Sequence, residues 1–204
     1  MKLLIAYGAD VNQMNFRGQV PIHKVANSAC CEELIKAGVN PNTRDVFGYT
    51  PLHFAAKVSS DLVKTLLDKG ANPFLKNLFS TNCLANAKSR EVVDLLVAQG
   101  LDPQETYRFG ERAIHCADEA DVIKALVEHG ADVDATDNLG ETALHKAKTA
   151  GAAQALIECG ADVHALNKKG RTPFKAHKSN REIYRLLLAA SEKRKHKILK
   201  WWHS

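Results

Sequence analysis

The chain is predicted to fold as an all-α solenoid, a stack of helix-turn-helix repeats joined by finger loops that resemble β-hairpins. Seven leucines recur at intervals of 30 or 32 residues, and an aliphatic residue follows each of them. A glycine stands four positions after each of the first six leucines. A fixed period of this length is typical of stacked repeats, which serve mainly as long binding surfaces. The leucines are Leu4, Leu34, Leu66, Leu96, Leu126, Leu156 and Leu186.

The finger loops are predicted from a second glycine, which usually follows the first one after ten residues. Eleven of the 12 glycines occupy these two positions, and only Ser80 interrupts the series. Glycine can adopt the left-handed backbone conformation that ends a helix or closes a turn. Asp or Asn, which favour turns, stands two positions after each of the first glycines. The glycines therefore mark the backbone of the repeat and do not indicate a phosphate-binding loop.

A short first helix is predicted directly after each finger. The best copies, such as Thr-Pro-Leu-His at 50–53, place Thr at the N-cap and Pro at the first helical position. The third residue is always apolar and is expected to face the core. Residues suited to N-capping follow closely, so that the second helix begins almost at once. These predicted caps are Asn27-Ser28, Ser59-Ser60, Ser89, Asp118 and Ser179-Asn180.

These motifs resemble the ankyrin repeat. The resemblance is carried by Gly-Tyr-Thr-Pro-Leu-His-Phe-Ala-Ala at 48–56 and Gly-Ala-Asp-Val-Asp-Ala at 130–135, and it covers 1–190. Most repeats have 30 residues, whereas the family norm is about 33, so the first helices should be about one turn shorter than usual. The resemblance implies a divergent member, such as those of intracellular bacteria or viruses. A partial repeat at 1–14 would precede repeats that begin near residues 15, 45, 77, 107, 137 and 167.

The resemblance implies that another protein binds to the finger tips and to the first helices, which line the concave side. The fingers are unusually apolar for loops in water, and this predicts a binding stripe. The alternative is that adjacent fingers cover the rings. The predicted binding residues are Phe16, Val46, Phe47, Tyr49, Leu78, Phe79, Tyr107 and Phe109 in the fingers, and Phe54, Asn86 and Cys116 on the first helices.

Three of these rings, Phe47, Phe79 and Phe109, share one position of the finger and are expected to be exposed. Substituting Ser for all three should abolish partner capture and leave thermal stability nearly intact. The two middle repeats depart most from the pattern, which places the expected contact region at residues 74–116. The alternative is sequence drift in repeats held by neighbours on both sides. In either case this region should show faster backbone hydrogen exchange than the rest of the interior repeats.

No catalytic residue, cofactor or metal site is predicted. Four histidines share one repeat position, where they are expected to serve backbone hydrogen bonding: His23, His53, His115 and His145. The five cysteines lack Cys-x-x-Cys spacing and indicate reduced thiols. The first helices show no continuous basic track, which argues against nucleic acid. We therefore expect a monomeric, non-enzymatic protein in the cytoplasm, which would be the host cytosol for a pathogen protein, with the nucleus as an alternative.

Two alternative functions depend on the ends of the chain. Residues 191–204 form a basic tail or cap, which could fold back on the last repeat, act as a nuclear-import-like cluster, or lie on an anionic membrane surface as part of a targeting module. The chain also begins within a second helix, which suggests a missing upstream segment and a regulatory role in a longer enzyme or effector. The tail residues concerned are Lys193, Arg194, Lys195, Lys197, Lys200, Trp201 and Trp202.

Overall fold

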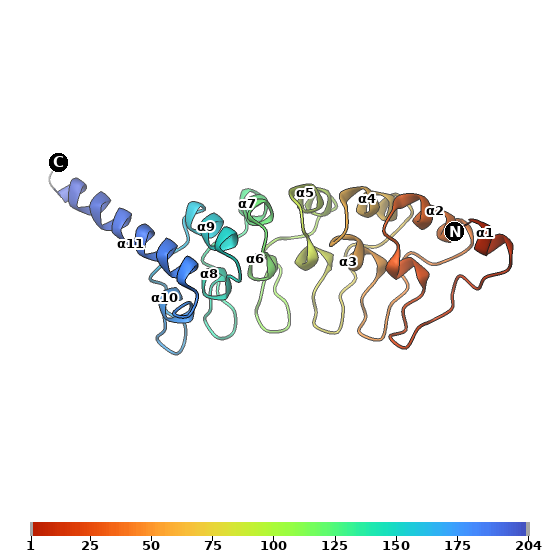
Figure 1. Cartoon of the computed structure of the whole chain (residues 1–204), viewed down its shortest axis with the longest axis horizontal. Helices are drawn as coiled ribbons and strands as arrows, with labels where there is room; N and C mark the ends of the chain where they lie inside the picture. Colours follow the sequence, from red (N-terminus) through yellow and green to blue (C-terminus); the bar gives the residue numbers. More distant parts are fainter. Residues whose placement is uncertain (1, 203–204) are drawn as a thin grey trace. The chain divides into compact units, whose positions relative to one another are not determined.

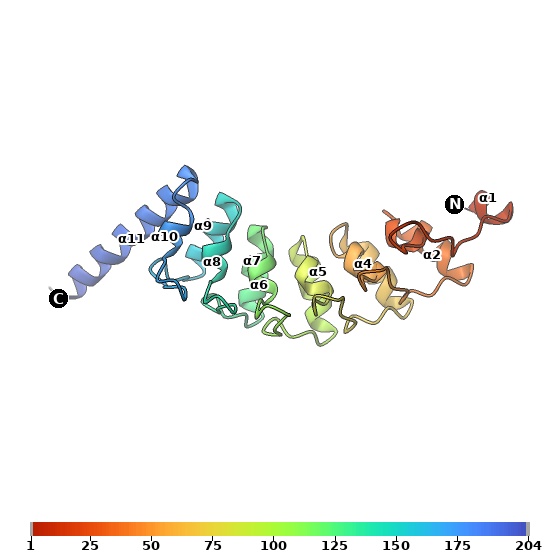
Figure 2. The same cartoon turned by 90° about the horizontal axis from the view of Figure 1, so that it is seen from below.

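A computed structural model of the chain describes the backbone of residues 2–202 and the side chains of residues 2–193. It forms two compact units, Met1–Arg108 and Phe109–Ser204, here called the N-terminal and C-terminal units. In each unit the second helices lie side by side, the short first helices line one side of them, and the finger loops project beyond the first helices (Figures 1 and 2). No strand is assigned between residues 2 and 202, and the fingers show one isolated bridge, Thr136 to Thr142.

The helices alternate between short and long members along the chain. The N-terminal unit contains α1 (Lys2–Ala6), η1 (Pro21–Lys24), α2 (Ser28–Lys36), α3 (Pro51–Ala55), α4 (Ser60–Asp68), η2 (Cys83–Asn86) and α5 (Arg90–Ala98). The C-terminal unit contains α6 (Ala113–Cys116), α7 (Ala120–Glu128), α8 (Ala143–Lys146), α9 (Ala150–Glu158), α10 (Pro173–Ala176) and α11 (Arg181–Trp202).

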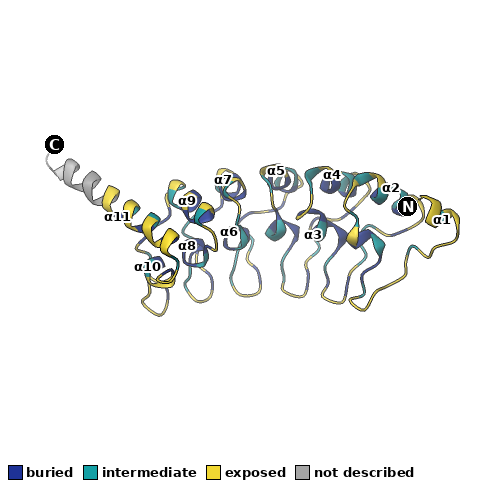
Figure 3. Ribbon diagram, viewed as in Figure 1, coloured by how far each residue is buried: buried dark blue, intermediate teal, exposed yellow. Residues whose placement is uncertain are grey.

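The core of each unit lies between its layers of helices. Leu34, Leu66 and Leu96 are fully buried where α2 packs on α4 and α4 packs on α5. Leu126 and Leu156 occupy the same place in α7 and α9. Burying one such side chain contributes about 1.5–3 kcal/mol. Figure 3 shows the buried residues along the inner sides of the helices and the exposed residues toward the finger tips.

The leucine register is interrupted at the two ends of the described chain. Leu4 is 61% exposed on α1. In α11 the buried residues are Ile183 and Leu187, whereas Leu186 is half-buried. The buried leucine of the last helix therefore lies one position later than in the preceding repeats, because α11 presents that position to α9 and α10.

Side chains cap most of the second helices as the sequence predicts. Asn27, Ser59 and Ser89 accept hydrogen bonds from backbone N–H groups of the first turn, which stabilises a helix start by about 1 kcal/mol. Asp118 is an exception, because the N-cap of α7 is Glu119. The Asp118 carboxylate instead receives a hydrogen bond from the Lys148 ammonium at 3.2 Å.

The first helices are single turns of four or five residues, as the short spacing predicts, and η1 and η2 are 3-10 helices. Each recurrent histidine connects its repeat to the next one. Nδ1 of His53 accepts hydrogen bonds from the Thr50 N–H at 3.1 Å and from the Thr50 hydroxyl at 2.9 Å, and Nε2 donates to the Thr81 carbonyl at 3.1 Å. His23, His115 and His145 make the corresponding Nε2 contact with a carbonyl of the next finger. The histidines are therefore structural.

Five of the fingers are closed by an Asp or Asn side chain at their base. The Asp45 carboxylate accepts hydrogen bonds from the N–H groups of Phe47 at 3.0 Å and Tyr49 at 2.9 Å. Asn15, Asn77, Asp137 and Asn167 do the same in their own fingers. Because these oxygens satisfy two backbone donors inside a tight loop, the fingers hold their shape without a β-ladder.

The second glycine position requires a left-handed backbone, which explains its composition. Ser80 is the one non-glycine residue with positive φ between residues 2 and 202, at 60°. Serine carries a Cβ, so this conformation costs about 1–2 kcal/mol that glycine does not incur. The finger nevertheless closes as the others do, because Asn77 still bonds to the backbone N–H groups of Phe79 and Thr81.

The last helix is longer than the other second helices and continues beyond α9 and α10 (Figure 1). Ser191 is buried, and its hydroxyl contacts Nε2 of His164 at 3.2 Å. Lys193 is exposed. The side chains predicted for a tail function beyond it, Arg194, Lys195, Lys197, Lys200, Trp201 and Trp202, lie outside the residues whose side chains are described. No described helix is long and apolar enough to span a membrane.

Candidate functional site

Exposed apolar side chains gather on the finger tips of the N-terminal unit. We call Phe16, Val46, Phe47, Leu78 and Phe79 the finger-tip stripe. All five are exposed, Phe47 by 47% and Phe79 by 43%. The stripe is held together by the backbone, because the Val46 N–H donates to the Arg17 carbonyl at 3.0 Å and the Leu78 N–H donates to the Phe47 carbonyl at 2.9 Å. Adjacent fingers therefore fix the spacing of the rings without covering them.

The fingers of the C-terminal unit become polar along the chain. Phe109 is 58% exposed, and Leu139 on the next finger is also exposed. Lys168 and Lys169 occupy the following tip. The same backbone link joins these tips, from the Asn138 N–H to the Phe109 carbonyl and from the Lys168 N–H to the Leu139 carbonyl, both at 3.0 Å. The apolar character is thus strongest in the N-terminal unit.

An aromatic cluster lies behind the stripe, at the base of the finger 45–49. Tyr49 and Phe54 are half-buried, with ring centroids 5.7 Å apart. Phe54 also packs edge-on against His23, and the Lys24 ammonium lies 5.4 Å from its ring centroid. Tyr49 and Phe54 were both predicted to bind a partner. The structure places them at the base of the finger, where both are half-buried and a part of each side chain remains accessible.

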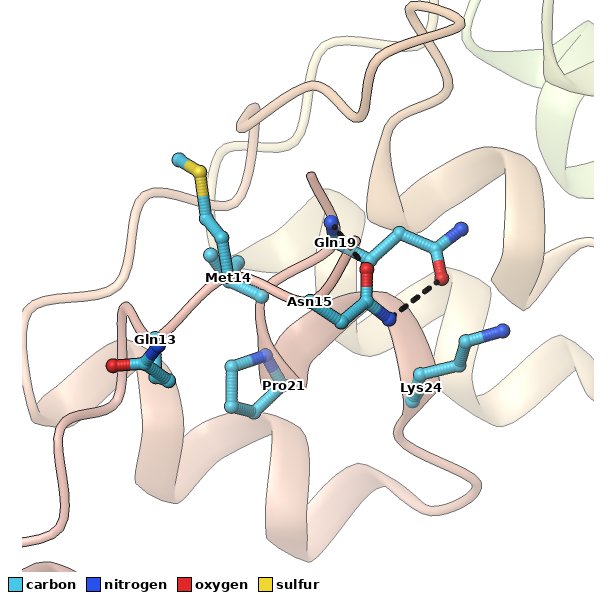
Figure 4. A pocket seen from close by; sticks show the side chains of 7 residues that line it. Gln13, Met14, Asn15, Gln19, Pro21 and Lys24 are labelled. Carbon is cyan, nitrogen blue, oxygen red and sulfur yellow. Dashed lines mark hydrogen bonds between the residues drawn. The ribbon is translucent and has the colours of Figure 1, made fainter. Parts of the chain in front are cut away.

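A shallow hollow of about 250 Å³ lies beside this cluster (Figure 4). Asn15 and Gln19 line it from the finger, with the Asn15 amide donating to the Gln19 side-chain oxygen at 3.4 Å. Lys24, Met14 and Pro21 also line the hollow. The hollow brings a cation and an apolar wall next to the start of the stripe.

Tyr107 is buried, with 5% of its surface exposed, so its predicted place on the binding surface was wrong. Its hydroxyl donates a hydrogen bond to the Asn82 side-chain oxygen at 3.2 Å. The same oxygen accepts from the Leu84 N–H at 3.0 Å, and the Asn82 amide bonds to Glu105, which also pairs with Lys76. This network replaces the missing Thr, Pro and His of the repeat. Internal hydrogen bonds thus hold the irregular residues of this repeat in place, and the contact region at residues 74–116 stays a prediction.

The remaining predicted positions on the first helices, Asn86 and Cys116, are half-buried. Burial raises the pKa of the Cys116 thiol to about 11, so it is a poor nucleophile at neutral pH. On the same side of the C-terminal unit, Lys146 pairs with Glu111 and with the buried Asp137. These ion pairs satisfy the charges locally and leave little for a ligand to contact.

The described residues show no arrangement suited to catalysis or to a metal ion. No cluster of three or more His, Cys, Asp or Glu side chains that could hold a metal occurs among them. Burial lowers the pKa of His53 to about 4, and burial also lowers the pKa values of His23 and His115. These imidazoles are therefore neutral at physiological pH, and His53 is fully occupied by its hydrogen bonds.

Sequence reasoning missed the basic residues that surround the stripe. Arg17 and Arg44 are exposed next to the tips, and Lys24 is exposed at the hollow. The first-helix position that follows the recurrent histidine carries mixed residue types and gives no sign of a basic surface. Comparing the net charge of whole finger-and-first-helix segments with the net charge of whole second helices would have revealed these cations.

Comparisons with known proteins agree with this architecture. The family described as Ankyrin repeats (3 copies) matches residues 1–77 and 82–167. An ankyrin repeat protein of variola virus is 33% identical over 87 residues, which make up 40% of this chain and 15% of that protein. A putative ankyrin repeat-containing protein of Treponema pallidum is 31% identical over 90 residues, 42% of this chain and 30% of that protein. The chain thus spans less than a third of these relatives.

Solved structures with the same fold cover nearly the whole chain. The human ASB11 ankyrin repeat domain superposes with a TM-score of 0.75 at 25% identity, covering 93% of this chain and 90% of that domain. The ankyrin repeat domain of Bcl-3 superposes with a TM-score of 0.62 at 25% identity, covering 92% and 90%.

Proposed function

We propose that this chain, which belongs to the ankyrin repeat family, is a non-enzymatic scaffold. It binds another protein through its finger tips and first helices. Members of this family generally bind proteins and typically have no catalytic activity. The observation that carries the proposal is the finger-tip stripe. Contiguous apolar side chains in water are unfavourable, and on a folded protein they mark an interaction surface.

The energetics of the stripe support a binding role. An aromatic side chain presents about 150–250 Å², so Phe47 and Phe79, each a little under half exposed, leave roughly 90 Å² each for a partner to cover. At about 25 cal/mol per Å², each ring could contribute about 2 kcal/mol to binding. Aromatic residues fixed in this way are the type that dominates the energy of protein interfaces.

The proposal is tested by affinity capture with the intact chain and with a variant that carries Phe16→Ser, Phe47→Ser and Phe79→Ser. Proteins that bind the stripe should be captured by the intact chain and lost from the variant. Phe74→Ser is the matched control, because Phe74 is 57% exposed but lies in the loop after α4 and not on a finger tip. Each protein is first shown to be folded by circular dichroism at the capture temperature.

Two results would count against the proposal. If the triple variant captures the same proteins as the intact chain, the stripe is not the binding surface. If the control loses them to the same extent, the effect comes from general loss of apolar surface. Removing residues 191–204 from a parallel sample separates the targeting alternative, which predicts that capture or localisation depends on the tail while the stripe variants behave normally.

A further inference from the structure

Charge is segregated between the two sides of the N-terminal unit. Its finger-and-first-helix segments, residues 13–26, 43–59 and 75–89, contain six basic residues and one acidic residue. The second helices α2, α4 and α5 contain three basic and six acidic residues. The finger-tip stripe therefore lies on the basic side of the unit. The six basic residues are Arg17, Lys24, Arg44, Lys57, Lys76 and Lys88.

The single acidic residue of these three segments does not offset their positive charge at the surface. Asp45 is buried, with 7% of its surface exposed. One carboxylate oxygen closes the finger through the Phe47 and Tyr49 N–H groups, and the other accepts from the Gln19 amide at 3.1 Å. The carboxylate is thus directed into the finger, and a ligand approaching the tips meets the basic side chains instead.

Three of the cations stand beside the stripe without a carboxylate partner among the described residues. The Arg17 guanidinium lies 5.3 Å from the Phe16 ring centroid. The Lys24 ammonium lies over Phe54 next to the hollow. The Arg44 guanidinium lies close to Gly48 and donates to the Lys76 carbonyl, so it sits between two adjacent fingers.

Several other basic side chains of this protein are neutralised by ion pairs with carboxylates. Lys76 pairs with Glu105 in the same unit. In the C-terminal unit, Lys146 pairs with Glu111 and Asp137, and Lys148 pairs with Asp118. Ion pairing within the chain is therefore common on this side of the repeats. The exposed cations around the stripe are different, because their positive charge is available to a ligand.

We propose that the finger side of the N-terminal unit binds an acidic protein segment, whose large apolar side chains cover the finger-tip stripe while its carboxylates lie beside Arg17, Lys24 and Arg44. This inference rests on the proposed function and specifies the chemistry of the partner. Complementary charge speeds encounter and fixes orientation, whereas the apolar contacts supply most of the affinity.

A single-stranded nucleic acid fits the same surface less well. Such ligands need aromatic side chains on which successive bases stack, together with a basic groove that follows the phosphates. Here an aliphatic side chain accompanies the ring on two of the three fingers, Val46 beside Phe47 and Leu78 beside Phe79. Aliphatic side chains favour apolar protein side chains over flat bases.

The test begins with a library of random 12-residue peptides displayed on phage and selected against the intact chain. The expected result is enrichment of peptides that carry a net negative charge and contain Leu, Phe or Trp. A selected peptide is then labelled with fluorescein, and its affinity is measured by anisotropy. Raising the NaCl concentration from 50 to 500 mM should weaken binding, because salt screens exposed charges.

Charge reversal provides the matched comparison. The double substitution Arg17→Glu and Lys24→Glu should lower the affinity for the selected peptide about tenfold or more. Each exposed ion pair between the chain and the peptide is worth up to about 1 kcal/mol, and charge reversal replaces its attraction by repulsion. Lys36→Glu with Lys64→Glu changes the net charge equally on α2 and α4 and should have little effect. If the double reversal impairs folding, the neutral pair Arg17→Gln and Lys24→Gln should give a smaller loss in the same direction.

The outcomes distinguish this inference from the proposed function. Selection of neutral or basic peptides that still require Phe47 and Phe79 would overturn the acidic partner and retain the finger-tip site. Selection of no peptide that depends on the stripe would count against both. A labelled 12-nucleotide oligo(U) that binds more tightly than the selected peptides, and is weakened by the same charge reversal, would replace the protein segment by a nucleic acid.

Discussion

The histidine that joins consecutive repeats should make stability depend on pH. His53 is buried, with 1% of its surface exposed, and burial is the main cause that lowers its pKa to about 4. In the unfolded chain the pKa returns to about 6.5. Between these values the unfolded chain binds more protons than the folded one, so the folded state is favoured as the pH rises. The contribution of His53 to the unfolding free energy is complete above pH 6.5 and is lost as the pH falls toward 4.

The size of the effect follows from the two pKa values. Lowering the pH from 7.5 to 5 should remove about 2 kcal/mol of unfolding free energy through His53 alone. Carboxylates also begin to titrate near pH 5, so the wild-type change is compared with that of His53→Gln. The variant should be less stable at pH 7.5 by about 2–4 kcal/mol, because the Thr50 N–H and the Thr81 carbonyl lose a partner.

Urea denaturation followed by circular dichroism at both pH values gives the required free energies. The wild-type protein should lose about 2 kcal/mol more than His53→Gln between pH 7.5 and pH 5. Equal losses in the two proteins would contradict this prediction, because they would show that His53 is protonated equally in the folded and unfolded states.

Three further predictions concern the irregular repeat. Ser80→Gly should raise the unfolding free energy by about 0.5–1 kcal/mol, since the relief of left-handed strain exceeds the entropy cost of glycine; a lower urea midpoint would contradict this. Tyr107→Phe should cost about 1 kcal/mol by removing the hydrogen bond to Asn82, and an unchanged midpoint would show that the network is unimportant. Hydrogen exchange should be faster in η2 than in α8, because η2 lacks the connecting histidine. Equal protection of η2 and α8 would show that the irregular repeat opens no more readily than a regular one.

The repeat architecture could be predicted from the sequence because it depends on local rules. Leucine spacing and paired glycines each report one helix or one turn. The short first helices followed from the missing residues between the two helices. In the last helix the spacing alone does not show that Leu187 is buried in place of Leu186, because this register is set by the packing of α11 on its neighbours. Such packing has no signature within a single repeat.

The candidate site was only partly predictable. Exposure of Phe47 and Phe79 followed from their shared position at a finger tip. Tyr107 was misplaced because its burial depends on a hydrogen bond to Asn82, which is 25 residues away. The role of Asp45 was also hidden, since its charge is used inside the finger. Residues from neighbouring repeats decide whether a side chain makes internal contacts or stays exposed to a partner. The repeat pattern does not encode these contacts between repeats.

The proposed binding surface for a partner protein is formed by the finger tips of the N-terminal unit. The most direct measurement is hydrogen–deuterium exchange of the chain alone and with a captured partner bound. We expect slower exchange in the fingers 45–49 and 77–81 and in α3, with little change in α4 and α5. Protection confined to α4 and α5 would contradict it, because the partner would then occupy the opposite, acidic side of the unit.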